Sequence, residues 1–305
     1  AAPPLALLGV TASGKSALAM ELARHRGDVE LVSVDSMQVY RGMDLGTAKP
    51  TAADQSRVPH HLYGTLPPSP AASAAQYAAL ADQTMQILAD RRCPAILCGG
   101  TGLYLRALLD GLFEGPPKNP ALRARLRAQV ESEGLPALHA RLAAVDPQAA
   151  ARIAPADYVR IERALEIYEG SGKPQSHWFA EHAAQRALGP RYSTLGIALD
   201  PGVDEVRTRI GQRVDQMLAQ GLLSEVAAQR ATGILPDAPL GYDLVCQHLD
   251  GALPLADLRT QLAQQTAQYA RRQRTWFRRD SSLTWYRDAD QVPIADIAAA
   301  VRATL

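Results

Sequence analysis

The sequence has 305 residues, with 32 Lys or Arg against 31 Asp or Glu, so its formal net charge is +1. Such a balance excludes a uniformly basic surface that binds nucleic acid through its phosphates alone, so any basic surface must be local. Apolar residues make up 47% of the chain, which supports a real core in one large or two modest domains and excludes a disordered chain.

The three cysteines are odd in number and lack the paired spacing of a zinc site, so they indicate neither a disulfide framework nor structural zinc. No stretch approaches the roughly 18 consecutive apolar residues that a membrane-spanning helix needs. Residues 1–9 carry no basic segment ahead of their short apolar run. We therefore expect a cytoplasmic protein with no membrane partner.

The first hundred residues alternate short apolar runs with helical spacing. Strands are predicted at residues 5–8, 29–34 and 95–98, and helices at 16–24 and 76–91. Short strands that are apolar on both faces are typical of a parallel sheet covered by helices on both sides. Residues 48–75, rich in Pro, Ala, Ser and His, are expected to form a long surface connection.

The pattern becomes purely helical near residue 116 and returns to the strand pattern near residue 190. Helices are predicted at 120–133, 135–144 and 157–169, a strand at 194–199, helices at 203–219, 222–231 and 255–277, and a short strand at 283–286. The predicted fold is α/β: a P-loop NTPase-like parallel sheet flanked by helices, with an all-helical insertion domain. Residues 1–115 and 190–305 form the core, and 116–189 form the insertion.

Residues 9–16, GVTASGKS, fit the phosphate-loop pattern G-x-x-x-x-G-K-[ST] between a predicted strand and a predicted helix. Backbone amides of such a loop, with the helix N-terminus, form an anion site for a di- or triphosphate. Lys15 would neutralise phosphate oxygens and Ser16 would reach a Mg²⁺ ion. The predicted diphosphate contacts are Gly9, Thr11, Ala12, Ser13, Gly14, Lys15 and Ser16.

Asp35 directly follows the second predicted strand, at the carboxyl edge of the sheet where ligands bind. A carboxylate there can act as a general base, although a capping or surface role is the alternative. Where hydrolytic P-loop proteins often carry a magnesium-binding Asp, the sequence has Gly99-Gly100-Thr101-Gly102. The glycines would let backbone approach a ligand, and Thr101 adds an uncharged hydroxyl. Because Asp200 is only a weak substitute carboxylate, group transfer is favoured over ATP hydrolysis.

Eight segments, in order and nearly from end to end, resemble the tRNA dimethylallyltransferases, the isopentenyl transferases that modify adenosine beside the anticodon. They are GVTASGKS (9–16), DSMQVYRGMDLGTAKP (35–50), PHHLYG (59–64), GGTGLY (99–104), RALEIY (163–168), RVDQMLAQGL (213–222), GY (241–242) and QYARRQRTWFRR (268–279). Eight ordered segments are far more specific than a lone phosphate loop.

The resemblance implies a reaction in which the loop holds dimethylallyl diphosphate, with Mg²⁺ as cofactor, and diphosphate leaves. Lys15 would stabilise the leaving group. Arg209 would add a second cation, with Arg213 as its nearby rival. Asp35 would take the proton of the adenosine N6 amine, and Thr101 would orient the amine or support the carboxylate. The adenine must be flipped out of its stack, and the segment that receives it is Ser36, Met37 and Gln38.

The same resemblance implies that the anticodon stem-loop of tRNA is held by local arginines. Residues 269–279 contain five arginines, and Trp276 or Phe277 would stack on bases; the alternative is an amphipathic helix with its aromatics in the core. The predicted tRNA contacts beyond the reaction centre are Arg123, Val159, Arg160, Arg163, Gly241, Tyr242, Arg271, Arg272 and Arg274. Val159 stands where the family usually has Gln, and Asp243 where it has a basic or polar residue.

Two other functions remain open from the residues themselves. A transferase that adds the same prenyl group to free AMP, ADP or ATP would share the phosphate loop and the aspartate. The helical insertion and the arginine-rich tail favour a macromolecular substrate instead. A small-molecule kinase or an RNA-binding switch protein would need a magnesium carboxylate after the third strand and a lid arginine cluster. The expected partners are tRNA and dimethylallyl diphosphate, bound by a monomer.

Overall fold

The computed structural model describes residues 4–68, 72–113, 115–233 and 239–301. The chain divides into two compact units, one made of Ala1–Leu109 with Tyr192–Leu305 and the other of Asp110–Arg191. No helix in the described ranges has the length and apolar character needed to cross a membrane.

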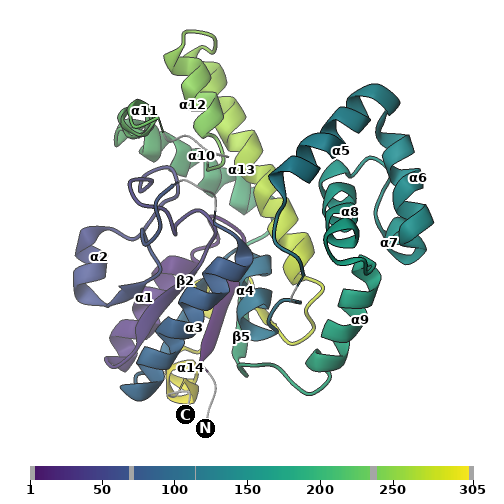
Figure 1. Ribbon diagram of the computed structural model, residues 1–305. Helices are drawn as coiled ribbons and strands as arrows, with labels where there is room; N and C mark the ends of the chain where they lie inside the picture. The colour runs from purple at the N-terminus through teal and green to yellow at the C-terminus, as the bar shows by residue number, and fades with distance from the viewer. Residues whose placement is uncertain (1–3, 69–71, 114, 234–238, 302–305) are drawn as a thin grey trace. The chain divides into compact units, whose positions relative to one another are not determined.

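A six-stranded sheet, with every neighbouring pair parallel, is the centre of the first unit (Figure 1). The strands are β1 (Leu5–Gly9), β2 (Glu30–Val34), β3 (His60–His61), β4 (Ala95–Gly99), β5 (Leu195–Leu199) and β6 (Thr284–Tyr286), in the order β3-β2-β4-β1-β5-β6. All residues of β1, β2 and β4 are buried, which is why these strands read as unbroken apolar runs in the sequence. The predicted parallel α/β fold is confirmed.

Helices cover both faces of this sheet (Figure 1). The first unit contains α1 (Lys15–Arg26), α2 (Ala52–Arg57), α3 (Ala74–Asp90), α4 (Gly102–Leu109), α10 (Val203–Ala219), α11 (Leu222–Ala231), α12 (Tyr242–Leu249), α13 (Leu255–Phe277) and α14 (Ile294–Ala300). On one face Leu18 of α1 packs in a cluster with Leu7 of β1, and on the other Tyr77 of α3 packs in a cluster with Leu8.

A third apolar cluster lies where β1 and β2 end. Val10 and Val39, from the segments after those strands, pack with residues of α10, α12 and α13, among them Ile210, Val245 and Leu262. These helices therefore cover the carboxyl edge of the sheet, which is where open parallel sheets bind ligands.

The expectation that residues 48–75 are only a surface connection is wrong in part. The segment contains α2, which begins at a capping box between Thr51 and Asp54, and β3, which pairs with Leu31 and Val32. A six-residue polar helix without a buried residue and a two-residue strand are too short to give a hydrophobic period, so the pattern did not reveal them.

The second unit consists of helices throughout its described residues. They are α5 (Pro120–Glu133), α6 (Leu135–Val145), α7 (Pro147–Arg152), α8 (Tyr158–Ser171) and α9 (Gln175–Arg186). Three of them begin at a capping side chain, because Asn119, Asp146 and Asp157 each accept a hydrogen bond from a backbone amide of the first turn. Leu126 of α5 and Leu165 of α8 belong to their shared core.

Candidate active site

The phosphate loop connects the end of β1 to the start of α1. Its chain bends through Ala12 at φ 60° and Gly14 at φ 91°, both left-handed conformations. A Cβ atom at Gly9 would lie 2.7 Å from the Leu199 carbonyl oxygen, so only glycine fits there. The side-chain oxygen of Ser13 is buried and has no partner among the described residues. The loop thus presents an unused polar atom beside the helix N-terminus, as an anion site does.

Lys15 is a partly buried cation at this loop. Its Nζ donates to the carbonyl oxygen of Val10 at 3.2 Å, and no described carboxylate forms an ion pair with it. Burial lowers the pKa of Lys15, while the nearby Cys98 and Asp35 oppose that shift. An anion placed at the loop would raise the pKa again and remove the cost of the buried charge.

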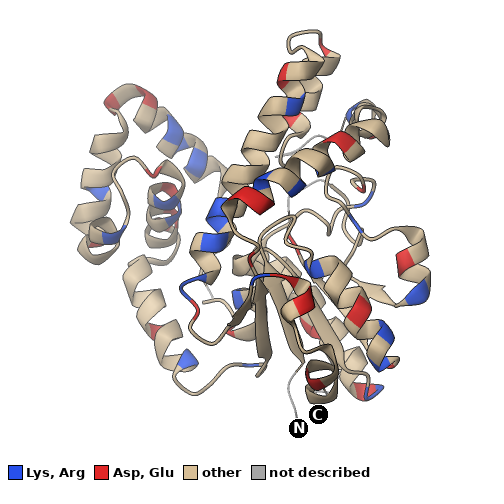
Figure 2. Cartoon of the chain, turned by 180° about the vertical axis from the view of Figure 1, so that it is seen from behind, with Lys and Arg blue, Asp and Glu red and all other residues tan. Residues whose placement is uncertain are grey.

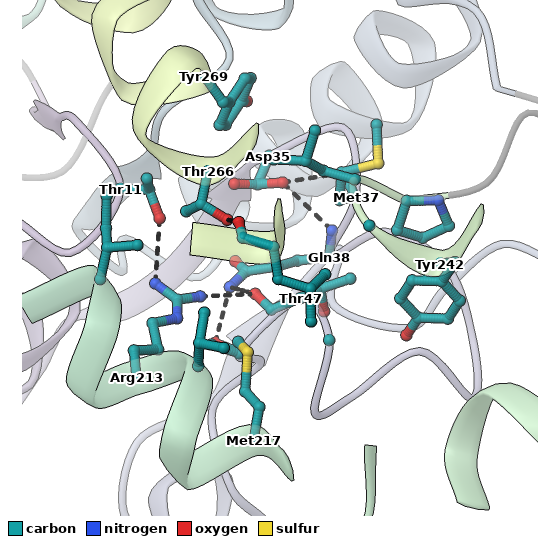
Figure 3. A pocket seen from close by; sticks show the side chains of 18 of the residues that line it. Thr11, Asp35, Met37, Gln38, Thr47, Arg213, Met217, Tyr242, Thr266 and Tyr269 are labelled. Carbon is teal, nitrogen blue, oxygen red and sulfur yellow. Dashed lines mark hydrogen bonds between the residues drawn. The ribbon is translucent and has the colours of Figure 1, made fainter. Parts of the chain in front are cut away.

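Arg213 of α10 is a second partly buried cation, and it faces the same loop (Figure 3). Its guanidinium donates to Thr11 Oγ1 at 3.1 Å and to the Thr47 carbonyl oxygen at 3.4 Å, and its Nε is buried without a partner. Burial lowers the pKa of Arg213, which Asp35 partly offsets. Arg209, one turn earlier, lies near Ser13 but is already paired with Glu205 and Asp288.

Asp35 follows β2 and lies across the cavity from these cations. Its Oδ1 accepts the backbone N–H groups of Met37 at 2.8 Å and Gln38 at 3.3 Å, and no described residue hydrogen-bonds to its Oδ2. Thr101, after β4, accepts the Ser36 N–H at 2.9 Å and donates to the Ser36 hydroxyl at 3.2 Å. The two predicted catalytic residues are therefore linked through Ser36, with one carboxylate oxygen left for a ligand.

Lys15, Asp35 and Arg213 line one cavity of about 290 Å³, whereas Thr101 and Arg209 are not part of its lining (Figure 3). Its polar end is formed by Thr11, Lys15, Ser16, Asp35, Arg213 and Gln273. Its apolar wall is formed by Ile210, Val214, Met217, Leu222, Val245 and Leu262. A cavity with cations, a carboxylate and an apolar wall suits a ligand that is charged at one end and hydrocarbon at the other.

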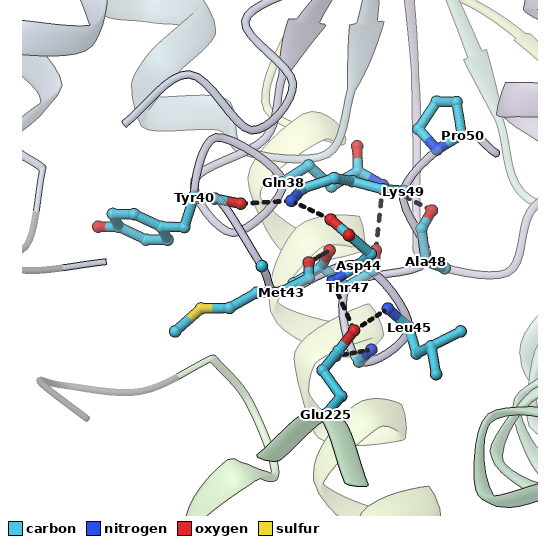
Figure 4. A network of polar contacts seen from close by, with 12 residues as sticks. Gln38, Tyr40, Met43, Asp44, Leu45, Thr47, Ala48, Lys49, Pro50 and Glu225 are labelled. Atoms are coloured by element: carbon cyan, nitrogen blue, oxygen red, sulfur yellow. Dashed lines mark hydrogen bonds and ion pairs between the residues drawn. The ribbon is translucent and has the colours of Figure 1, made fainter. Parts of the chain in front are cut away.

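Sequence reasoning missed the residue that holds the segment 44–48 at this cavity (Figure 4). Glu225 of α11 accepts the backbone N–H groups of Asp44, Leu45 and Gly46 at 2.8, 2.7 and 3.0 Å, and the Tyr242 hydroxyl at 2.6 Å. Tyr242 covers Gly46, where a Cβ atom would lie 2.4 Å from the ring. Nothing in the sequence marks Glu225, because its partners are backbone amides about 180 residues away.

Gln38, expected to read an adenine edge, has its amide nitrogen bonded to the carbonyl oxygens of Thr47 at 3.0 Å and Ala48 at 2.9 Å. Its side chain therefore fixes the same segment as Glu225 does. Tyr269 of α13 lies above Asp35 in the cavity (Figure 3). Burial, with Asp35 nearby, raises the pKa of Tyr269 to about 12, so it remains a neutral donor at physiological pH.

Basic residues lie on α13 (Figure 2), and their contacts differ from one another. Arg271 is exposed, and Arg272 lies over the Tyr269 ring at 5.6 Å and lines the cavity. Arg274 instead forms a bidentate pair with the buried Asp200, at 2.6 and 2.7 Å. Asp200 is thus engaged in an ion pair at the end of β5, away from the cavity lining.

The aromatic residues Phe277 and Trp276 of the same helix differ in their exposure. Phe277 is 2% exposed and belongs to the sheet core, as the amphipathic-helix alternative expected. Trp276 keeps 36% of its surface exposed and has the Arg106 guanidinium 4.8 Å from its ring centroid. Gly241 and Tyr242 of the predicted RNA turn line the cavity.

In the second unit, two of the predicted tRNA contacts are held by one buried carboxylate. Arg123 and Arg163 both pair with Glu166, which is 1% exposed and also accepts the Asn119 N–H. Burial would raise the pKa of Glu166, but these hydrogen bonds and charges outweigh it and lower the pKa to about 2. Val159 is 71% exposed, and the exposed Arg160 pairs with Asp157.

The described residues contain no group of three or more acidic, His or Cys side chains that would hold a metal. Ser16 and Asp35 nevertheless supply a hydroxyl and a carboxylate to the cavity. Hard oxygen ligands of this kind suit Mg²⁺ bound largely through a substrate's phosphates and water.

The fold and the site define a P-loop protein with a partly apolar cavity beside its phosphate loop. Residues 38–280 match the family model described as IPP transferase. The chain is 47% identical over 284 residues to a tRNA dimethylallyltransferase of Anaeromyxobacter sp. (strain Fw109-5), covering 92% of this chain and 93% of that protein. It is 44% identical over 281 residues to one of Geobacter metallireducens, covering 91% and 90%. The chain belongs to the tRNA dimethylallyltransferase family.

Solved structures agree with this assignment. The crystal structure of a full-length tRNA isopentenylpyrophosphate transferase from Bacillus halodurans has a TM-score of 0.68 at 36% identity, covering 97% of this chain and 94% of that one. A eukaryotic dimethylallyltransferase acting on tRNA, 24% identical, shares the fold with a TM-score of 0.75 over 95% of this chain and 74% of that one.

Proposed function

We propose that this protein transfers the dimethylallyl group of dimethylallyl diphosphate to the N6 amine of the adenosine 3′-adjacent to the anticodon of tRNA, releasing diphosphate. One observation carries the proposal beyond the family name. Two partly buried cations without a carboxylate partner among the described residues, Lys15 and Arg213, face one cavity with Asp35 and an apolar wall.

The cations supply the leaving-group side of the reaction. A buried charge is costly unless an opposite charge meets it, and a diphosphate brings that charge. As the bond between the allylic carbon and its oxygen breaks, negative charge grows on the diphosphate. Lys15, Arg213 and the loop amides then stabilise the transition state more strongly than the ground state. Because Arg209 is already paired with two acids, we assign the second cation to Arg213.

The apolar wall suits the prenyl group. Side chains of α10 and α13, such as Val214 and Leu262, provide hydrocarbon contact beside the polar end of the cavity. Contact with hydrocarbon excludes water from the allylic carbon, which favours transfer to the amine over hydrolysis.

Asp35 supplies the acceptor side. The N6 lone pair is delocalised into the adenine ring, so the amine becomes nucleophilic only as its proton is removed. The carbon–nitrogen bond forms as the carbon–oxygen bond breaks, and the amine proton passes to Asp35 Oδ2. Thr101 holds the Asp35–Ser36 turn through the Ser36 amide. Met37 and Gln38 belong to the segment that receives the flipped adenine, a step that costs a few kcal/mol of unstacking.

Mg²⁺ fits the oxygen donors of this site, and Ser16 would hold it beside the diphosphate. When bound, it would neutralise part of the diphosphate charge.

The tRNA would be held by arginines on both units. We assign phosphate contacts to the exposed Arg271, to Arg272 at the rim, and to Arg160 of the helical unit. Arg160, Arg123, Arg163 and Arg274 all have acidic partners, so an RNA phosphate would have to share these arginines with them.

The proposed function is tested by its acceptor. The protein is incubated with labelled dimethylallyl diphosphate, Mg²⁺ and an anticodon stem-loop with adenosine at the target position, with AMP, ADP and ATP in parallel. Label should enter the stem-loop at N6 of that adenosine. A stem-loop with guanosine there is the matched control and should stay unlabelled. Label in free nucleotides instead would support the adenylate transferase.

A further inference from the structure

We propose that Gln273 is a positioning residue whose side-chain amide fixes the spacing between the phosphate loop and the Gly99–Gly102 turn. This inference rests on the proposed function, which assigns the phosphate loop to the leaving group and places the Gly99–Gly102 turn beside the base. The contacts that Gln273 makes to Thr11 and Gly100 are here called the Gln273 bridge.

Both ends of the amide are used. Gln273 is 5% exposed on α13, and its Oε1 accepts the backbone N–H of Thr11 at 2.7 Å. Its Nε2 donates to the backbone carbonyl oxygen of Gly100 at 2.9 Å. Buried polar groups that lose such partners are destabilised by the full cost of their desolvation, so the amide has one favourable orientation.

Two glycines of the turn, Gly100 and Gly102, make room for α13. A Cβ atom at Gly100 would lie 2.1 Å from the Gln273 amide nitrogen, and one at Gly102 would lie 2.0 Å from the Trp276 ring nitrogen. Gln273 and Trp276 are three residues apart and therefore lie on one face of the helix. At these two glycines the absence of a side chain therefore permits close packing with a helix.

The bridge joins the two halves of the reaction centre. On the loop side, the Thr11 hydroxyl also accepts a hydrogen bond from the Arg213 guanidinium. On the turn side, Gly100 precedes Thr101, which bonds to Ser36 beside Asp35. Displacement requires nucleophile, carbon and leaving group in line, and a misplacement of about 1 Å can lower the rate about 100-fold. Gln273 therefore sets the distance between the diphosphate and the base, while both polar atoms of its own amide are bonded to backbone groups.

The test compares Gln273→Met, which keeps length but loses both hydrogen bonds, with Gln264→Met, the same change at an exposed position of α13. Single-turnover transfer at saturating substrates should fall about 100-fold in Gln273→Met. The Kd values for the stem-loop and for dimethylallyl diphosphate should stay within about threefold, and Gln264→Met should match the wild type. A residue with only a general structural role would lower binding, stability and rate together.

Gln273→Glu gives a second variant if Gln273→Met does not fold, because it keeps the acceptor for Thr11 and loses the donor to Gly100. Its transfer rate should be lower by about tenfold. Hydrogen exchange of residues 5–13 provides a readout independent of catalysis, and the Thr11 amide should exchange faster in both variants. A wild-type rate with unchanged exchange would overturn the Gln273 proposal. A wild-type protein that labels no stem-loop would overturn the proposed function instead.

Discussion

Removing the carboxylate of Glu225 should free the segment 44–46 from the rest of the site. Three consecutive backbone amides and the Tyr242 hydroxyl converge on this one side chain (Figure 4). The residues that follow, Thr47 and Ala48, line the cavity, and Thr47 also contacts Arg213. Loss of Glu225 is therefore expected to loosen one wall of the cavity rather than unfold the sheet.

The magnitude follows from the contacts. A hydrogen bond to a charged group contributes about 1.5–3 kcal/mol, and the freed amides regain part of this from water because the segment is partly exposed. For Glu225→Ala we expect a net local loss of about 3 kcal/mol. That corresponds to roughly 100-fold faster amide exchange in the segment. Glu225→Gln keeps an acceptor and should lose about half as much free energy.

Hydrogen exchange of residues 43–49 measures this opening, with the exposed Glu21→Gln as the control variant. A double-mutant cycle with Tyr242→Phe should give a coupling of about 1.5 kcal/mol or more, because the phenol donates to the same carboxylate. Unchanged exchange in Glu225→Ala, or a coupling near zero, would refute the reasoning that this carboxylate holds the segment.

Three further outcomes are expected. Arg213→Met should weaken dimethylallyl diphosphate binding by about 10- to 100-fold. Arg209 is already paired with two acids, so Arg209→Met should change this affinity by less than about threefold. Equal effects of the two variants, measured by calorimetry, would contradict the assignment of the second cation to Arg213. Below about pH 4.5 the helical unit should lose stability as Glu166 is protonated. The folded pKa of Glu166 is about 2 and its ordinary value is 4.5, so the stabilisation that its carboxylate provides is complete above pH 4.5 and is lost as the pH falls toward 2. Glu166→Gln should flatten this pH dependence in thermal melts followed by Trp fluorescence. Charge reversal at Arg271 and Arg272 should weaken stem-loop binding and reduce its salt slope by about one per lost phosphate contact, with diphosphate binding retained for Arg271→Glu.

The sequence predicted the elements whose signal is local. β1, β2 and β4 are wholly buried and read as apolar runs, and α13 is long enough for a clear period. Helices such as α4, α12 and α14 have only seven or eight residues and were not predicted. Elements this short form chiefly through tertiary packing, which a single sequence does not display.

The residues of the site likewise fall into those that the sequence indicated and those that it did not. Lys15, Asp35 and Thr101 stand in motifs beside strand ends, so the sequence indicated them. Glu225 and Gln273 act on backbone groups far away in the chain, and no motif predicts which amide a side chain will meet. Phosphate contacts are equally hard to predict, because the sequence does not indicate which arginines will pair with an acid in the fold. Arg274, for example, pairs with Asp200.

The central claim is that Asp35 removes the amine proton while Lys15 and Arg213 hold the diphosphate. The most direct test is the single-turnover rate of Asp35→Asn with both substrates bound, since the amide keeps the acceptor for the Met37 and Gln38 N–H groups. The rate should fall by about 100-fold or more, with dimethylallyl diphosphate affinity unchanged within about threefold. A transfer rate within a few-fold of the wild type would contradict the account.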